Sequence, residues 1–324
     1  MGSEMCIRDS PVISLAKSGR WDVIPFFLRL CGVIRRINAY TLYTFLPTEN
    51  LVGLGIKALF PRLRLVWSIR SSFVDLEQHD LMIRSAYRLQ TLLHWLPQAV
   101  VVNSREGYDH AVRGGMKSDR LTVILNGVDT SRFRPDSGGR EACRSLWNVK
   151  PNEVLIGLVA RVDPMKGHEV FLKAAALSHA SDRFRFVIVG RCDGDQGMRL
   201  RAENERLGLR DRMIWAGERL DMVPVYNALD VLVSASYGEG FSNVIAEAMA
   251  CGTPCVVTDV GDSAILVGTT GRVVSPGDPE AMAAAVQQLL SDDMRSLGAR
   301  ARERITELFS VEVMVRRTEE ILRK

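Results

Sequence analysis

The chain has 324 residues, of which 47% are hydrophobic and 25% are charged. This length exceeds one typical domain of about 100 to 200 residues and the composition is that of an ordinary folded protein, so general disorder is excluded and two domains are expected. The charge is uneven, because residues 1–140 hold 19 Lys and Arg against 12 Asp and Glu, whereas the rest of the chain holds 23 against 26.

The six cysteines form no Cys-x-x-Cys pair and no Cys/His spacing of the kind that zinc needs. They are therefore predicted to be reduced thiols in a cytoplasmic protein. No apolar run reaches the roughly 18 residues needed to span a bilayer, and the first residues do not resemble a secretion signal. We expect neither secretion nor a membrane span.

The basic half of the chain mixes cations with apolar segments. Such a mixture can hold anionic lipid headgroups at the inner face of the plasma membrane. An ordinary solvated basic surface explains it equally well. The cations concerned are Arg29, Arg35, Arg36, Lys57, Arg62 and Arg64.

Residues 1–10 have neither helical nor strand periodicity. We therefore expect a segment that is not native and exclude it from the fold prediction. After them, short β-branched runs alternate with amphipathic segments, which is typical of βαβ units on a parallel sheet. Strands are predicted at residues 40–45, 65–69, 99–103 and 122–125. Helices are predicted at residues 49–60, 76–95 and 104–113, the last with Ser104 as its N-cap.

The Asn126-Gly127 turn and a run rich in turn-forming residues, 135–140, predict a domain boundary. We therefore expect an N-terminal domain at 11–140, a C-terminal domain at 141–310 and a final helix at 311–324. In the second domain, strands are predicted at 154–160, 184–189, 213–215, 231–234, 254–258 and 272–274. Helices are predicted at 168–180, 198–207, 221–228, 242–251 and 279–290. Strands this apolar are buried on both faces, so the sheet is predicted to be doubly wound.

The most informative stretch, residues 234–254, leaves a buried strand, crosses a glycine-rich turn and enters a helix capped by Ser242. The free amides of such a helix start favour an anion. Glu239 and Glu247 frame this turn, and a carboxylate on an apolar helix face is costly to bury unless it accepts hydrogen bonds. Sugar or ribose hydroxyls would supply these bonds. Alternatively, both carboxylates simply lie at the surface.

A second group of residues lies after the strand at 154–160. Arg161 and Lys166 are expected at the carboxyl edge of the sheet, where open α/β folds bind ligands. Two cations beside a helix start suit a diphosphate and would stabilise it as a leaving group. They could also be surface cations of a loop. His168 is a weaker candidate for the same edge.

These motifs resemble the retaining glycosyltransferases of family 4, the glycosyl transferases group 1. The resemblance covers about residues 40–310 and is strongest at 120–290. Its motifs are Val-Ala-Arg-x4-Lys-Gly (159–167), Phe-Val-Ile-Val-Gly (186–190), Glu-Gly-Phe-Ser-Asn (239–243), Glu-Ala-Met-Ala-Cys-Gly-Thr-Pro (247–254), and Asn-Gly-Val-Asp (126–129) with Phe133 and Pro135.

The resemblance implies an α/β protein with the GT-B fold, two Rossmann-like domains with doubly wound parallel sheets that face a cleft. It implies a hexosyltransferase that acts with retention and without a metal ion, and no cofactor beyond its nucleotide diphosphate sugar donor. A UDP- or GDP-sugar would donate a hexose to a polysaccharide or lipid-linked acceptor. No nucleic acid partner is expected.

The resemblance also assigns roles to residues. Glu239 would contact the transferred sugar and Glu247 the ribose, while Arg161 and Lys166 would bind the diphosphate. The amides of Gly240, Phe241, Ser242 and Asn243 would surround sugar and phosphate, and the segment 217–220, with Arg219 and Leu220, would lie against the base.

Two departures from the family pattern concern the N-terminal half. No glycine-rich loop precedes Tyr40, so one or two βα units are expected to be missing. Where many relatives place a His-Asp pair, this chain has Arg70, Ser71 and Ser72, and Arg70 is a candidate for binding an anionic acceptor or the diphosphate.

Other functions fit the sequence less well. A nucleotide-sugar-binding fragment without transfer activity, because its N-terminal lobe is incomplete, is the main alternative. An epimerase or phosphorylase of the same architecture is a further rival. A nicotinamide-dependent dehydrogenase is disfavoured, since no Gly-x-Gly-x-x-Gly follows a strand.

Overall fold

The computed structural model describes residues 12–17, 19, 22–70, 81–178 and 183–323. The chain forms two units, residues 1–125 together with 314–324, and residues 126–313. The division lies between Leu125 and Asn126, at the first of the two turn-rich segments predicted to mark the boundary and upstream of the expected domain limit at residue 140.

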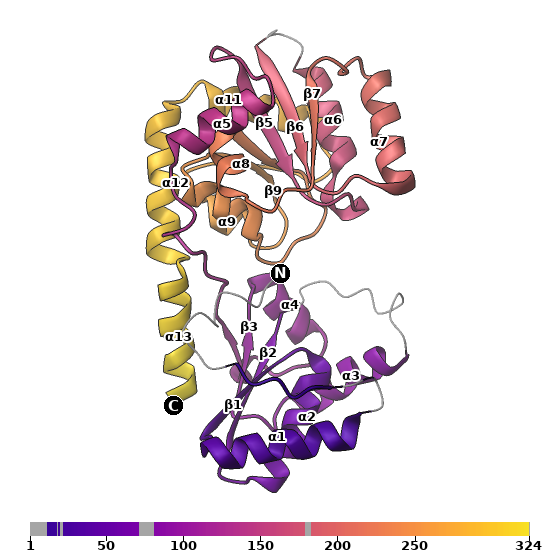
Figure 1. Cartoon of the computed structure of the whole chain (residues 1–324), viewed down its shortest axis with the longest axis vertical. Coiled ribbons are helices and arrows are strands. Elements are labelled where there is room, and N and C mark those ends of the chain that lie inside the picture. Colours follow the sequence, from indigo (N-terminus) through magenta and orange to yellow (C-terminus); the bar gives the residue numbers. More distant parts are fainter. Residues whose placement is uncertain (1–11, 18, 20–21, 71–80, 179–182, 324) are drawn as a thin grey trace. The chain divides into compact units, whose positions relative to one another are not determined.

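The first unit is built on a parallel sheet with the strand order β1-β2-β3-β4 (Figure 1). Its strands are β1 (Thr41–Phe45), β2 (Arg64–Ile69), β3 (Ala99–Val102) and β4 (Leu121–Val123). Its helices are α1 (Val23–Ile37), α2 (Pro47–Leu59), α3 (Leu81–Leu92), α4 (Arg105–Arg113) and most of α13 (Val311–Arg323). The hydroxyl of Ser104 accepts a hydrogen bond from the amide of Gly107 at 2.9 Å, as an N-cap should.

Alternation along the strands divides the core of this unit between the two faces of the sheet. Leu65 and Trp67 lie in one cluster with Val100. Val66 points to the opposite face, where Met314, Ile321 and Leu322 of α13 pack. The last helix of the chain therefore covers one face of the first sheet, which explains a helical segment that has no strand of its own.

The second unit contains a six-stranded parallel sheet with the order β10-β9-β8-β5-β6-β7. Its strands are β5 (Val154–Val159), β6 (Phe184–Val189), β7 (Met213–Gly217), β8 (Val231–Ser234), β9 (Cys255–Thr258) and β10 (Arg272–Val274). The strands in both units lie within two residues of their expected bounds. The order reverses between β5 and β8, so this pair forms the switch point at which such sheets bind ligands.

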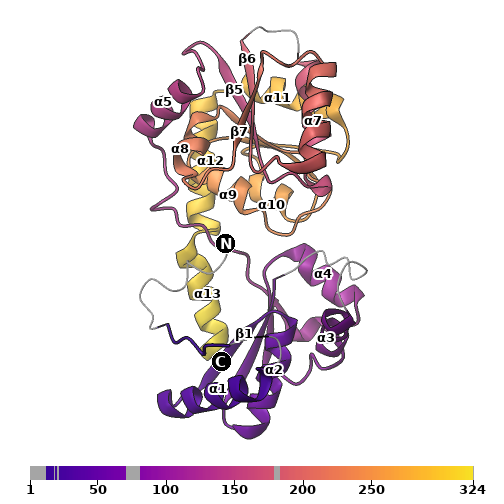
Figure 2. The ribbon, with the colours of Figure 1, turned by 45° about the vertical axis from the view of Figure 1, so that its right-hand side comes forward.

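Helices cover both faces of the second sheet (Figure 2). One layer packs on Ile156, Leu158 and Val233 and contains α6 (His168–Leu177), α7 (Gly194–Arg206) and α11 (Pro279–Leu290). The other contains α5 (Ser137–Leu146), α8 (Val223–Ala228), α9 (Asn243–Ala250), α10 (Ser263–Val267) and α12 (Met294–Leu308). The doubly wound arrangement expected for this half is present.

Helix α5 occupies the stretch that was expected to break secondary structure. The carboxylate of Asp136 accepts a hydrogen bond from the amide of Gly139 at 3.0 Å and caps the helix. Arg140 and Arg144 then form ion pairs with Asp230, at 2.6 and 3.0 Å, which tie α5 to the second unit. Capping and this docking outweigh the low helix propensity of the two glycines.

Candidate functional site

A cavity of about 180 Å³ lies at the carboxyl edge of the second sheet, where β5 and β8 end. Arg161 and Lys166 enter it from the loop after β5, and Glu239 and Ser242 from the loop after β8. Two segments more than 70 residues apart therefore meet at the switch point. The cavity combines cations, a carboxylate and the start of α9.

Lys166 and Glu239 form the centre of this cavity. The Nζ atom of Lys166 donates to Oε1 of Glu239 at 2.6 Å, and the side chains are only 26% and 13% exposed. The hydroxyl of Ser236 donates to the same oxygen at 2.8 Å. Partial burial strengthens this ion pair relative to one in open water.

The loop that carries Lys166 is held against the sheet. Asp163 caps the short 3-10 helix at Pro164–Lys166 by accepting from the amide of Met165 at 2.9 Å. Gly167 follows with φ of +63°, and a Cβ there would lie 1.9 Å from the carbonyl oxygen of Ala235. Only glycine allows the loop after β5 to approach the loop after β8 this closely.

Arg161 is the more exposed of the two cations. Its side chain is 78% exposed, and the nearest carboxylate oxygen, from Asp163, lies 3.6 Å away. A guanidinium on the wall of the cavity and held by one weak ion pair can turn toward a bound anion at little cost.

The turn at residues 240–243 joins this cavity to α9. Ser242 is the N-cap residue by backbone position, but its hydroxyl makes no capping hydrogen bond. The first amides of α9 are thus left for another acceptor. The side chain of Phe241 is buried against Phe309, with ring centroids 6.0 Å apart, so Phe241 faces the core of the unit. The oxygen Oδ1 of Asn243 accepts from Asn126 at 3.4 Å.

Glu247 lies on α9 and does not line this cavity. Its Oε2 accepts a hydrogen bond from the hydroxyl of Tyr226 at 2.7 Å. Burial raises the pKa of Glu247, although the Tyr226 hydrogen bond and the charge of Arg132 act in the opposite direction. A tyrosine within the protein thus supplies one of the hydrogen bonds that we expected from a ligand.

Arg219, Leu220, Arg70 and His168 are not among the residues that line this cavity. Arg219 donates to the carbonyl of Ala216 at 3.1 Å, and Leu220 is 86% exposed in the loop after β7. Arg70 directly follows β2 in the first unit, with its guanidinium 5.1 Å from the ring centroid of Phe45. Ser71 and Ser72 lie outside the described residues.

His168 was a weak candidate for the carboxyl edge, and its side chain is buried instead. It begins α6 and is 3% exposed. Burial lowers its pKa, so the ring is held neutral. His168 is therefore a core residue behind the loop that carries Lys166.

Sequence reasoning missed Ser236 and Tyr226. Both are almost fully buried and both donate to a carboxylate of the expected site. Ser236 had a weak signal, since a polar residue directly after a buried strand faces the ligand edge of a parallel sheet. Tyr226 had none, because its partner is 21 residues away in the sequence.

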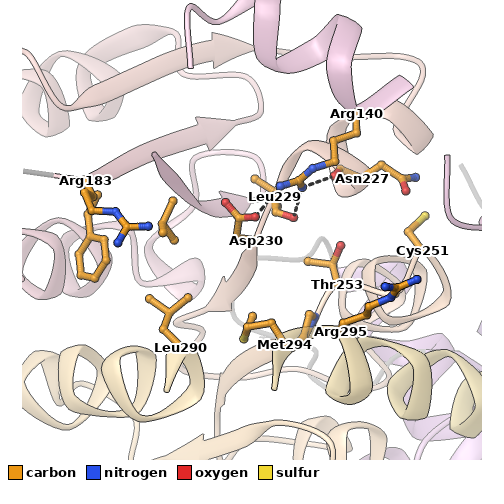
Figure 3. A pocket seen from close by; sticks show the side chains of 14 residues that line it. Arg140, Arg183, Asn227, Leu229, Asp230, Cys251, Thr253, Leu290, Met294 and Arg295 are labelled. Atoms are coloured by element: carbon orange, nitrogen blue, oxygen red, sulfur yellow. Dashed lines mark hydrogen bonds and ion pairs between the residues drawn. The ribbon is translucent and has the colours of Figure 1, made fainter. Parts of the chain in front are cut away.

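A larger cavity, of about 930 Å³, lies at the opposite, amino edge of the second sheet (Figure 3). Its walls include Val154, Leu229 and Pro254, each at the start of a strand or next to it. Arg140, on its wall, is already bonded to Asp230 and to the carbonyl of Asn227. These polar groups hold α5 on the sheet, so size alone does not make this cavity the functional site.

Comparison with known proteins points in the same direction. Residues 153–292 match the family described as Glycosyl transferases group 1. The D-inositol 3-phosphate glycosyltransferase of Rhodococcus opacus (strain B4) is 36% identical over 217 residues, which cover 63% of this chain and 48% of that protein. The lipopolysaccharide core biosynthesis mannosyltransferase LpsB of Rhizobium meliloti (strain 1021) is 33% identical over 201 residues, which cover 59% of this chain and 57% of that protein. The chain spans about half the length of the curated relatives it matches.

A crystal structure of Anabaena Alr3699/HepE in complex with UDP has the same fold. The TM-score is 0.81, at 22% sequence identity, and the match covers 92% of this chain and 82% of that chain. The match identifies residues 153–292 as a domain of the group 1 glycosyltransferases, and the two Rossmann-like parallel sheets, with this structural likeness, show that the chain has the GT-B fold.

Proposed function

We propose that the protein transfers a hexose, with retention, from a UDP- or GDP-sugar to a polysaccharide or lipid-linked acceptor. The observation that carries this proposal is the cavity at the β5–β8 switch point, which gathers Arg161, Lys166 and Glu239 beside the start of α9. The Anabaena neighbour was crystallised with UDP and with UDP-glucose, and LpsB is named a mannosyltransferase. These names support a nucleotide-sugar donor for this chain.

In the proposed reaction, Lys166 and Arg161 bind the donor diphosphate and stabilise the charge that develops on it as it leaves. Glu239 holds hydroxyls of the transferred sugar, and Glu247 those of the ribose. The bond between the anomeric carbon and the phosphate oxygen breaks, and the acceptor oxygen bonds to that carbon from the same face. The acceptor proton passes to the departing phosphate oxygen, which conserves atoms and charge.

Arg219, Leu220 and Arg70 keep the roles proposed from the sequence, contact with the base for the first two and with an anionic group for the third. Transfer is proposed to need no metal ion, because two protein cations serve the diphosphate. Transfer that persists in excess EDTA would support this, and restoration of lost activity by added Mg²⁺ would contradict it.

Nucleotide binding is the first test. A thermal-shift panel of UDP-, GDP- and ADP-sugars should show stabilisation by one of them, about 2.7 kcal/mol at 100 times its Kd. No stabilisation by any of these donors would contradict the proposal.

Transfer itself is tested with two variants. Lys166→Ala and Glu239→Ala should each lower the transfer rate by about 10² to 10³, the usual effect of losing one transition-state contact, while circular dichroism stays unchanged. Wild-type binding of the donor without transfer to any acceptor would instead favour the alternative function, a nucleotide-sugar-binding fragment whose N-terminal lobe is incomplete.

Association with an anionic membrane surface is a further part of the proposal. Ile24 and Leu28 of α1 are 73% and 64% exposed and lie on the same helix as Arg36. Among the described helices, none is both long and apolar enough to cross a bilayer. Several of the basic residues have internal roles, since Lys57 donates to two backbone carbonyls and Arg29 pairs with Asp22. Co-sedimentation with anionic but not neutral vesicles would support this association, and no co-sedimentation would exclude it.

A further inference from the structure

The two carboxylates of the proposed donor site share an unexpected arrangement. In each, one oxygen accepts a hydrogen bond from a buried hydroxyl, Ser236 for Glu239 at 2.8 Å and Tyr226 for Glu247 at 2.7 Å. The other oxygen, Oε2 of Glu239 and Oε1 of Glu247, has no hydrogen-bond partner among the described residues. A free carboxylate oxygen can accept up to two hydrogen bonds.

We infer that Tyr226 and Ser236 are positioning residues, which fix one oxygen of each carboxylate so that the other faces the hydroxyls of the donor. This inference rests on the proposed function, because it takes ribose as the ligand of Glu247 and the transferred sugar as the ligand of Glu239. Neither hydroxyl needs to touch the donor.

The surroundings of Tyr226 make its hydroxyl a fixed donor. The residue is 1% exposed, and its ring packs against Phe133 with centroids 6.0 Å apart. Its carbonyl accepts from the hydroxyl of Thr253 at 2.7 Å, which restrains the backbone. A carboxylate on the apolar side of α9 would otherwise be free to turn between rotamers, so the bond to Tyr226 selects one of them.

Ser236 is held in a comparable way. It is 2% exposed, and its carbonyl accepts from the hydroxyl of Thr258 at 2.6 Å. Its hydroxyl shares Oε1 of Glu239 with Lys166, so this oxygen has two donors. When the donor diphosphate draws Lys166 away, the Ser236 bond remains and keeps the carboxylate in place for the sugar.

The two hydroxyls act on different parts of the donor, and this gives a specific signature. UDP contains the ribose but lacks the transferred sugar, whereas UDP-glucose contains both. Loss of the Tyr226 hydroxyl should weaken the binding of both ligands equally. Loss of the Ser236 hydroxyl should weaken the binding of UDP-glucose and leave the binding of UDP almost unchanged.

Isothermal titration calorimetry with UDP and UDP-glucose tests this signature in the full chain. We expect Tyr226→Phe to raise the Kd of both ligands about tenfold, as for a lost hydrogen bond to a charged group. Ser236→Ala should raise the Kd of UDP-glucose by about the same factor, with the Kd of UDP within about twofold of wild type. The measured Kd, unlike the stoichiometry, is independent of the fraction of molecules that fold.

Matched controls remove buried hydroxyls that do not touch either carboxylate. Ser178→Ala deletes a buried hydroxyl bonded to the carbonyl of Ala174, and Thr270→Val deletes one bonded to the carbonyl of Val267. Both controls should keep the Kd of each ligand within about twofold of wild type. If they weaken binding as much as the test variants do, general loosening explains the effect and the inference is wrong.

A double-mutant cycle provides the second measurement. In a Glu247→Gln background, Tyr226→Phe should change the Kd of UDP much less than it does in the wild type, because the two groups act as one unit. The inference would be overturned, while the proposed function stands, if Tyr226→Phe changed the Kd of UDP as much in that background as in the wild type. It would also be overturned if Ser236→Ala lowered the affinities for UDP and UDP-glucose equally. A wild-type chain that binds neither of these ligands nor any other nucleotide sugar of the thermal-shift panel would overturn both.

Discussion

At the scale of single residues, the two carboxylates of the site lie in opposite electrostatic surroundings. Glu239 faces the ammonium of Lys166, whereas Glu247 is buried beside the neutral hydroxyl of Tyr226. Burial therefore disfavours the charged form of Glu247 and raises its pKa, a cost that the Tyr226 hydrogen bond offsets only in part. Such a cost is typical of a group that serves a ligand rather than the fold.

The raised pKa of Glu247 gives a stability prediction. In the folded chain the pKa of Glu247 lies above its ordinary value of 4.5. Its protonated form therefore stabilises the fold. This contribution is fully present below pH 4.5 and is lost as the pH rises through the pKa of the folded state. At pH 7 the charge is a burden, so Glu247→Gln should raise the free energy of unfolding there. The gain should shrink as the pH is lowered toward 4.5.

Urea unfolding of Glu247→Gln and wild type at several pH values measures this difference. Glu303→Gln, at an exposed position of α12, serves as the control and should change little at any pH. A Glu247→Gln variant less stable than wild type at pH 7 would contradict the interpretation. The same variant should bind UDP more weakly, because an amide replaces the carboxylate proposed to hold the ribose.

At the scale of elements, the site depends on how closely two loops approach each other. Gly167 has φ of +63° and lies against Ala235, while Gly261, with φ of +54°, lies against the carbonyl oxygens of Glu239 and Gly240. The loops after β5 and β9 therefore each need a residue without a side chain where they approach the loop after β8. The short, apolar strands fix where these loops begin.

A pair of glycine variants separates backbone strain from close approach. Gly167→Ala and Gly208→Ala both place alanine at a positive φ, +63° and +70°, but only the first would bring a Cβ within 4 Å of another atom. Gly208→Ala should lower the free energy of unfolding by about 1 to 2 kcal/mol and leave UDP binding intact. Gly167→Ala should lower the free energy of unfolding by more than this. It should also weaken UDP binding, since Lys166 must move with the loop.

Thermal unfolding and UDP titration of both variants check this prediction. If Gly167→Ala binds UDP as tightly as Gly208→Ala does, the loop position does not control the diphosphate site.

Periodicity in the sequence predicted the strands of both sheets well, because parallel strands such as β5 and β8 are continuous apolar runs. It failed at α5, since a local pattern with two glycines hides a helix that is fixed by Asp136 at its start and by Asp230 across the unit. For the same reason the run at 135–140 belongs to the second unit, and the division falls at the Asn126-Gly127 turn.

At the scale of the whole chain, the residues of the cavity all belong to the second unit, 126–313. This unit has its own core between its sheet and its helices. Compact units with their own core can in principle fold alone. Under the proposed function, donor binding is therefore expected of this unit and acceptor binding of the other.

A fragment of residues 126–313 tests this division. It should fold and bind UDP within a few-fold of the Kd of the full chain, and it should transfer no sugar because the first unit, with Arg70, is absent. The cut falls within α13, whose later residues pack on the first sheet, so the fragment loses no core of its own. A folded fragment that fails to bind UDP would show that the first unit contributes to the donor site.

The sequence by itself determined the alternation of strands and helices, the fold class and the two segments that carry Arg161, Lys166, Glu239 and Glu247. It could do so because propensity, capping and apolar runs act over a few neighbouring residues. Only the tertiary structure decided which groups meet: Lys166 with Glu239, Ser236 with the same carboxylate, and Tyr226 with Glu247. These contacts depend on strand order and on loop approach across the sheet, which no local pattern contains.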